Sequence, residues 1–158
     1  VTGDSETFDA GCLWTSSTPI HLPEEIRFYY GAYPGWNSDL ENDSTGIGLA
    51  ILPRDRFAAI EPTDAIAQVT LKSIQLRNVK RVTINADATD GDVRVELLTA
   101  EGYRVAGYTR DQSVIITGNS FRHPVNWKDK AMTDLAAGRY QLRLHVKNAR
   151  LFALTIQR

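Results

Sequence analysis

The stretch RVTINADATDGDVRVELLTAEG, residues 81–102, carries the clearest alternation of apolar and polar residues in the chain. Every second residue is apolar over 82–86 and again over 93–97. A period of two is typical of a strand with one buried face and one solvent-exposed face. Asp90-Gly91 separates the two runs, and an Asp-Gly pair in that position predicts a tight hairpin turn. The stretch therefore predicts two antiparallel strands.

Similar runs lie on both sides of this stretch, in QVTLKSIQL (68–76), YQLRLHV (140–146) and RLFALTIQ (150–157). The first contains a one-residue slip, which predicts a bulge. Turn residues separate the runs, and the expected turns or loops are Glu101-Gly102, Gly118-Asn119, His123-Pro124 and Lys147-Asn148. In PRDRF (53–57), Pro53 should end one strand, an arginine should pair with Asp55, and Phe57 should begin the next strand.

These patterns predict the fold class. The only helical candidate, NWKDKAMTDLAAG (126–138), is short and should form at most one or two turns. About ten short strands with regular turns predict an all-β antiparallel sandwich, jelly-roll or lectin-like in shape. The length of 158 residues suits a single β-sandwich domain over residues 1–158.

Composition excludes several classes of function. Eighteen basic and nineteen acidic residues give a formal charge of -1, which argues against nucleic acid as a partner. The sequence contains no run of 18 apolar residues, so no membrane span is predicted. Cys12 is the single cysteine, so neither an intrachain disulfide nor a thiolate zinc cage is expected. The apolar neighbour Leu13 indicates that Cys12 is a small buried residue of the core.

The aromatic stretch RFYYGAYPGWN, residues 27–37, is the strongest candidate for function. If Phe28 and Tyr30 face the core of a strand, then Arg27 and Tyr29 face outward. Gly31 should break the strand, and Tyr33 and Trp36 should follow in a Pro-Gly turn that holds their rings near the surface. That turn opens the longest polar loop, PGWNSDLENDSTG (34–46). Exposed loops on a rigid scaffold often carry function.

Sugars present apolar faces rimmed by hydroxyl groups, so exposed aromatic rings and planar polar groups suit them. The rings predicted to stack on a ligand are Trp36, Tyr33 and Tyr29. The predicted polar partners are Asn37, Asp39, Tyr108, Arg110 and Asp111. Burial of Trp36 and a plain Arg110–Asp111 surface pair are the alternatives. Trp14 and Trp127 are expected in the core.

The sequence offers no catalytic constellation. The adjacent Glu24 and Glu25 point to opposite faces of a strand, so they cannot flank one glycosidic bond. His123 and His145 lie beside no nucleophile elbow, and a loop or surface role is expected for both. We therefore predict no catalytic residue, no metal ligand and no cofactor. Calcium in the loop at Asp39 is an alternative, although DLEND matches no complete ligand set.

The order of several segments resembles a known family. The segments are IRFYYGAY, GIGLAILPRDRFAAIEP, INADATDGDVRVELLTAEGYRVAGY, VNW and YQLRLHVKNARLFALTIQ. Together they resemble the C-terminal end of bacterial five-bladed-propeller glycoside hydrolases, of the levanase and arabinanase kind. The resemblance covers roughly residues 8–157. It implies a segment that closes the propeller, followed by an appended sandwich that braces the enzyme or binds carbohydrate.

This sequence differs from the family at one point, because PGWNSD replaces a segment that usually holds a histidine. We expect a free-standing module in which the N-terminal strands join the sandwich. The resemblance implies a secreted, extracellular bacterial protein with an attached or neighbouring catalytic domain. We predict a non-catalytic carbohydrate-binding module for a polysaccharide or oligosaccharide. The alternatives are a structural accessory domain of a glycoside hydrolase and a small glycoside hydrolase.

Overall fold

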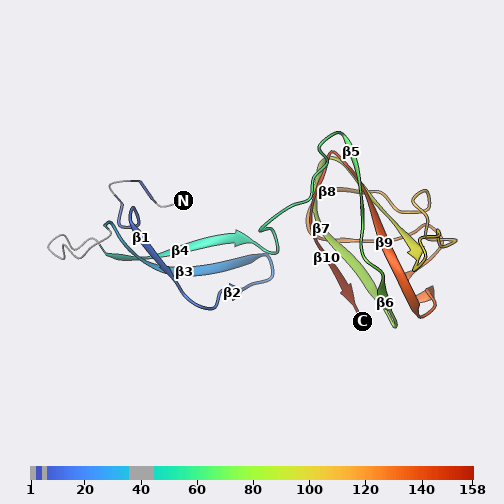
Figure 1. Ribbon diagram of the computed structural model, residues 1–158, viewed down its shortest axis with the longest axis horizontal. Coiled ribbons are helices and arrows are strands. Elements are labelled where there is room, and N and C mark those ends of the chain that lie inside the picture. Colours follow the sequence, from blue (N-terminus) through green and yellow to red (C-terminus); the bar gives the residue numbers. More distant parts are fainter. Residues whose placement is uncertain (1–2, 5–6, 36–44) are drawn as a thin grey trace. The chain divides into compact units, whose positions relative to one another are not determined.

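The computed structural model describes residues 3–4, 7–35 and 45–158. Its contacts divide the chain into two compact units, Val1–Asp55 (unit 1) and Arg56–Arg158 (unit 2). In Figure 1 the blue and cyan strands belong to unit 1, and the green to red strands belong to unit 2. The two units are described separately, and a single domain over residues 1–158 stays a prediction.

Unit 1 contains a four-stranded antiparallel sheet. Its strands are β1 (Cys12–Thr15), β2 (Ile20–His21), β3 (Glu25–Tyr33) and β4 (Gly46–Pro53). β3 is central, because β1 and β2 pair with opposite ends of one edge and β4 pairs along the other edge. We expected these strands to join the sandwich, but they form a sheet of their own.

Unit 2 contains a six-stranded antiparallel sheet. Its elements are β5 (Ile66–Thr70), β6 (Ile74–Leu76), β7 (Arg81–Thr99), β8 (Ile116–Pro124), the 3-10 turn η1 (Met132–Asp134), β9 (Gly138–Lys147) and β10 (Arg150–Gln157). The slip predicted in 68–76 is an interruption that separates β5 from β6, and both pair with β9. The helical candidate is reduced to η1, as its length predicted.

β7 is one continuous strand, so the hairpin predicted at Asp90-Gly91 is wrong. The first part of β7 pairs with β8 and β10, and the part after Gly91 pairs with β9. A Cβ at Gly91 would clash with the backbone carbonyl groups of Lys147 and Asn148. The glycine therefore allows a close approach of two backbones and does not form a turn.

Both parts of β7 contribute to one hydrophobic core. Alternate residues of 82–88 and 93–97 are fully buried, together with the apolar face of β9 at 142–146. A sheet that folds across a shared core in this way is a sandwich-like arrangement. The predicted all-β antiparallel fold class is confirmed.

Two of the predicted turns are confirmed. Gly102 follows β7 with φ of 93°, and its N–H donates to the carbonyl oxygen of Thr99 at 3.0 Å. Asn148 lies between β9 and β10 with φ of 42°. Both residue types tolerate the left-handed conformation that these turns require.

The loops predicted at 118–119 and 123–124 are wrong, because both pairs lie within β8. Gly118 has φ of 80° at the point where β8 shifts its register against β7. Its left-handed backbone therefore serves a bulge inside the strand. Pro124 ends β8, where the missing N–H is tolerated.

The predictions for PRDRF are partly confirmed. Pro53 ends β4, and the Nε of Arg54 lies 3.5 Å from Oδ2 of Asp55. Phe57 does not begin a strand, since β5 begins only at Ile66. That expectation was wrong because the segment before β5 meets the sheet through an isolated bridge between Ile60 and Leu151 and through side-chain contacts, and not through a ladder.

Arg56 provides the clearest of these side-chain contacts. Its guanidinium carbon lies 4.5 Å from the ring centres of both Phe121 and Phe152. Its nitrogen atoms donate to the side-chain oxygens of Asn85 at 2.8 Å and Asn119 at 2.7 Å. Cation–π contacts and paired amide acceptors fix this residue against β7, β8 and β10.

Candidate functional site

The alternation predicted for the aromatic stretch is confirmed on β3. Tyr29 and Tyr33 are 43% and 46% exposed, whereas Ile26 and Ala32 on the opposite face are buried. Phe28 and Tyr30 are half-buried on the Ile26 side. The strand break predicted at Gly31 is wrong, because Gly31 is paired on both sides and β3 continues to Tyr33. β3 thus presents Tyr29 and Tyr33 together on one side of the sheet.

Tyr30 is held in place from three directions. Its hydroxyl donates to Oδ2 of Asp9 at 2.9 Å, and its ring is parallel to that of Phe8. A Cβ at Gly48 would clash with the Tyr30 ring, so glycine is needed on the neighbouring strand. The hydrogen bond to Asp9 raises the pKa of Tyr30. Tyr30 is therefore a structural residue of unit 1.

Directly paired residues of an antiparallel sheet share one face, so the register of unit 1 defines what surrounds Tyr29 and Tyr33. Gly31 pairs with Trp14 on β1 and with Ile47 on β4. We call the resulting surface the apolar sheet face. It consists of Trp14, Ile20, Tyr29, Tyr33, Ile47, Leu49 and Ile51, all of which are exposed.

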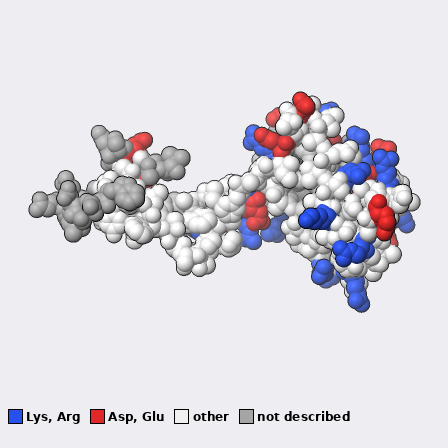
Figure 2. All heavy atoms as spheres, in the orientation of Figure 1, with Lys and Arg blue, Asp and Glu red and all other residues white. Residues whose placement is uncertain are grey.

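Among the described residues, the charged side chains of this face lie at one end. Arg27 pairs with Glu25 on the same strand, with 2.6 Å between Nε and Oε1. Figure 2 shows few charged side chains over β1–β4 in the side that is in view, and many over unit 2. At the centre of the face, a Cβ at Gly31 would meet no atom within 4 Å. The apolar sheet face is therefore open at its middle.

Three predicted ligand residues, Trp36, Asn37 and Asp39, lie outside the described residues. The alternative calcium ligands in the same loop lie there as well. Within residues 3–4, 7–35 and 45–158, no group of three His, Cys, Asp or Glu side chains could hold a metal ion.

Tyr108, predicted as a polar partner, is buried in unit 2 at 3% exposure. Its ring packs edge-on against Trp127 at 5.1 Å, and its hydroxyl donates to the carbonyl oxygen of Ala131 at 3.0 Å. Burial raises its pKa. Arg110 and Asp111 are exposed. Tyr108 therefore does not line a surface rim with these two residues, because the core ring of Trp127 draws it inward.

The other two tryptophans divide between core and surface. Trp127 is buried as predicted, and its Nε1 donates to the carbonyl oxygen of Val95 at 3.0 Å. Trp14 was expected in the core, but it is 67% exposed on the apolar sheet face. Cys12, also expected in the core, is half-buried. Local apolar neighbours indicated burial for both, yet in the described structure that side of the sheet is exposed.

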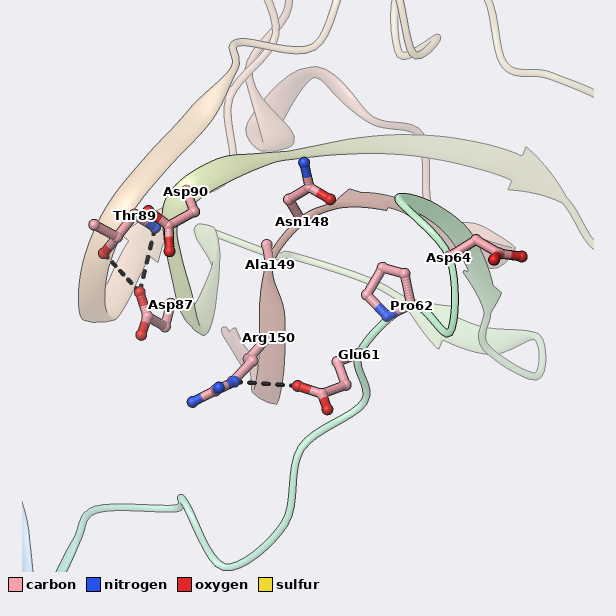
Figure 3. A pocket seen from close by; sticks show the side chains of 9 residues that line it. All are labelled: Glu61, Pro62, Asp64, Asp87, Thr89, Asp90, Asn148, Ala149 and Arg150. Carbon is pink, nitrogen blue, oxygen red and sulfur yellow. Dashed lines mark hydrogen bonds and ion pairs between the residues drawn. The ribbon is translucent and has the colours of Figure 1, made fainter.

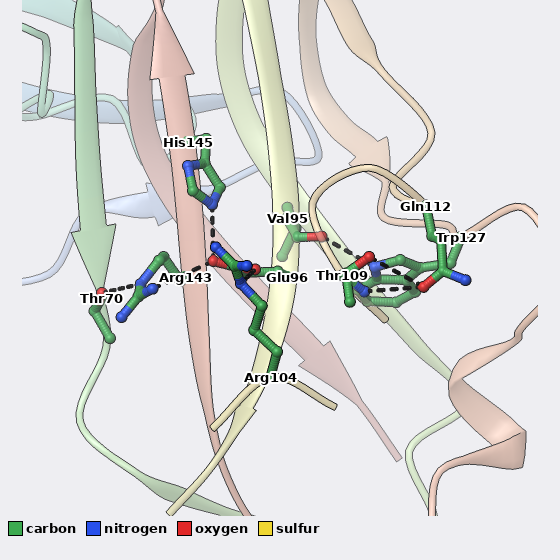
Figure 4. A network of polar contacts seen from close by, with 9 residues as sticks. All are labelled: Thr70, Val95, Glu96, Arg104, Thr109, Gln112, Trp127, Arg143 and His145. Atoms are coloured by element: carbon green, nitrogen blue, oxygen red, sulfur yellow. Dashed lines mark hydrogen bonds and ion pairs between the residues drawn. The ribbon is translucent and has the colours of Figure 1, made fainter. Parts of the chain in front are cut away.

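A buried charge network was missed by sequence reasoning. Glu96 on β7 is fully buried, and its Oε1 lies 2.9 Å from Nε2 of His145 and 3.4 Å from Nη1 of Arg143. Arg104 approaches the other carboxylate oxygen, Oε2, with its Nε at 3.3 Å. Figure 4 shows the three basic side chains converging on Glu96. The surface role predicted for His145 is wrong, because Glu96 recruits it as a partner.

The network controls the ionisation of Glu96. Burial acts to raise the pKa of Glu96, because a charged carboxylate is poorly solvated there. The hydrogen bond and charge of His145, followed by the charges of Arg104 and Arg143, outweigh burial and hold the pKa below its ordinary value. Glu96 is therefore a carboxylate at neutral pH.

A pocket of about 410 Å³ lies elsewhere in unit 2, lined by Glu61, Asp87 and Arg150 among others (Figure 3). Arg150 donates to Oε2 of Glu61 at 3.1 Å, and Thr89 donates to Oδ1 of Asp87 at 2.7 Å. The bonds from Thr89 and the charges of nearby arginines lower the pKa of Asp87. These polar groups of the pocket already pair with other side chains of the pocket, so the pocket is not the candidate site.

Comparisons with known proteins identify no relative of this chain. No protein-family model, curated protein or solved structure matches this chain. The resemblance to propeller glycoside hydrolases therefore stays a prediction. In the described part of the chain, no helix has the length and hydropathy of a membrane span.

Proposed function

We propose that the protein is a non-catalytic accessory module of a glycan-degrading enzyme, seated on a β-rich catalytic domain through the apolar sheet face. One observation supports this proposal most. The sheet of unit 1 is apolar on both sides, with Ile26 and Ala32 buried on one face and Ile47 exposed on the other. An antiparallel sheet that meets water on one face normally carries polar residues there. A sheet apolar on both faces suits a position between two packed layers.

The character of the face favours protein as the occupant. Contiguous exposed apolar surface marks interaction sites, and sheets pack face to face through apolar side chains. Tyr29, Tyr33 and Trp14 are residue types enriched at protein interfaces, since each combines a large ring with a polar group. The resemblance to a segment that closes a propeller points to another β-sheet of a catalytic domain as this layer.

Gly31 allows a sharp test of docking. Gly31→Arg places a charge at the centre of the apolar sheet face, and the added Cβ meets no atom within 4 Å. Gly35→Arg is the matched control, because a Cβ at Gly35 also meets no atom. Both variants and the wild type would be mixed with purified five-bladed-propeller hydrolase domains that lack their own C-terminal sandwich. Complex formation would be measured by size-exclusion chromatography with light scattering.

We expect a one-to-one complex with the wild type and with Gly35→Arg. Gly31→Arg should weaken the complex by at least about 100-fold, because an unpaired charge would be buried between two apolar layers. Equal binding by both arginine variants would contradict the proposal, and so would the absence of a complex with every domain tested.

A carbohydrate-binding module is the second candidate, and the exposure of Tyr29 and Tyr33 on one face favours it. Two rings on one strand can stack on successive sugars. Pull-down on insoluble polysaccharides would then retain the wild type and lose the Tyr29→Ala and Tyr33→Ala variants. Trp36→Ala tests the third predicted ring, and Phe57→Ala is a control at an exposed ring of unit 2. If a variant with both Tyr29→Ala and Tyr33→Ala is still retained on the polysaccharide, this result would argue against carbohydrate binding by unit 1.

A further inference from the structure

The Glu96 network leaves one buried oxygen without a hydrogen bond. Oε2 of Glu96 is inaccessible to solvent and accepts no hydrogen bond in the described structure. The Nε of Arg104, 3.3 Å away, contributes an ion pair only. A buried polar atom left in this state is costly, and most such atoms in native proteins are satisfied. Oε2 is therefore balanced by the charge of Arg104 and can still accept a hydrogen bond.

Donors beside this oxygen are also unused. Arg104 is 69% exposed, and its ion pair with Glu96 engages only Nε. Arg143 uses Nε on Thr70 and Nη1 on Glu96. Each guanidinium group thus retains N–H groups that can donate to a ligand. An unsatisfied acceptor and unused donors lie side by side.

The sheet brings this cluster to the surface. In the register of unit 2, Glu96 pairs with Arg143, and Arg143 pairs with Thr70 of β5. Gln68, which pairs with His145 in the next row, is exposed and adds an amide to the same face. Figure 4 shows the exposed Arg104 side chain reaching Glu96, where its Nε forms the ion pair with Oε2. Movement of this side chain would release Oε2 from that ion pair.

The chemistry of the cluster selects a class of ligand. Oε2 can accept a hydrogen bond, but a cationic donor would be repelled by the guanidinium groups of Arg104 and Arg143. A carboxylate or a fully ionised phosphate ester would bind the arginines but leave Oε2 without a donor. A hydroxyl group donates to the carboxylate and accepts from a guanidinium group at the same time. Neighbouring hydroxyl groups satisfy both kinds of group at once.

We propose that Glu96, Arg104 and Arg143 form a binding site for adjacent hydroxyl groups of a neutral saccharide, in which movement of the Arg104 side chain releases Oε2. The site lies on the β7–β9 face of unit 2. It goes beyond the proposed function, because it uses none of the residues of the apolar sheet face.

The test is a titration of the whole chain, followed by two-dimensional NMR of its backbone amides. The probes are neutral gluco-, xylo-, manno-, arabino- and fructo-oligosaccharides, with an oligogalacturonate as the charged comparison. Saturable shifts centred on residues 94–96, 104 and 143–145 with at least one neutral probe are the expected result. Binding of the oligogalacturonate alone, or no saturable shift at this face, would overturn the proposal.

Variants identify the residues that bind. Arg104→Ala removes an exposed side chain and should weaken binding at least tenfold. Glu96→Gln keeps the shape but can donate where an acceptor is needed, and should weaken binding similarly. Arg139→Ala removes an exposed arginine of β9 that bonds to Ser73 and should bind like the wild type. Unchanged affinity in Arg104→Ala overturns the proposal even if Glu96→Gln fails to fold.

A last variant separates the two proposals. The Tyr29→Ala/Tyr33→Ala double variant should retain the amide shifts in unit 2, whatever it does to docking or to polysaccharide pull-down. If this variant abolishes the saccharide response, the response arises in unit 1 and the Glu96 site is wrong.

Discussion

At the scale of single residues, Glu96 shows how charge can stabilise a buried carboxylate. The side chain is fully buried, yet three basic residues on β9 and beyond β7 keep its pKa low. Removing one partner from a buried charge network leaves an uncompensated charge, which typically costs about 3–5 kcal/mol. Glu96 therefore links the stability of unit 2 to pH.

The pKa of Glu96 lies below its ordinary value of 4.5 in the folded protein. A lowered folded-state pKa stabilises the protein above the unfolded-state value, and this contribution is lost as pH falls through the folded-state pKa. The urea midpoint of the wild type should therefore fall as the pH is lowered below 4.5. Glu96→Gln should lose about 1–3 kcal/mol at pH 7 and show a shallower decline in acid.

Urea denaturation between pH 7 and pH 3 measures both effects. Glu24→Gln, which removes an exposed carboxylate of unit 1, is the control. Parallel pH profiles for the wild type and Glu96→Gln would contradict the role assigned to Glu96.

At the scale of elements, β7 determines the architecture of unit 2. Its first part pairs with β10 and with most of β8, and its second part pairs with β9, so one strand joins both sides of the core. Gly91 makes this possible, because the backbone of Lys147 passes where a side chain would stand. The same pair, Asp90-Gly91, predicts a hairpin when only the local sequence is considered.

Gly91→Ala should destabilise the protein by about 1–3 kcal/mol, as overpacking of a tight site does. The β-carbon would force the turn between β9 and β10 away from β7. Chemical denaturation measures the change, and Gly31→Ala is the control because its Cβ meets no atom within 4 Å. Equal stability of the two variants would show that Gly91 is not required for close approach.

The alternating runs over 82–86, 93–97 and 140–146 predict strands correctly, because a side-chain period of two is a local property. The face that carries Tyr29 is predicted for the same reason. The partners of each strand are not local, and neither are the bulge at Gly118 and the network at His145. These features depend on residues that lie dozens of positions away along the chain.

At the scale of the whole molecule, burial is distributed unevenly between the two units. The core of unit 2 draws on β7, β9, β10 and the segments around Trp127. In the described part of unit 1, Ile26 and Ala32 are the buried hydrophobic residues. Stability scales with buried apolar area, so unit 1 has the most to gain from a partner layer. The docking test with Gly31→Arg addresses this gain directly.

The all-β class, the outward face of Tyr29, and the turns at Gly102 and Asn148 follow from the amino-acid sequence, because period and turn chemistry act between near neighbours. The burial of Tyr108 and His145, the exposure of Trp14 and the continuity of β7 follow only from tertiary structure. Each of these depends on which distant strand supplies a partner or leaves a face uncovered. The pairing of strands is determined by the free energy of the whole fold, so it cannot be predicted from a short segment of sequence.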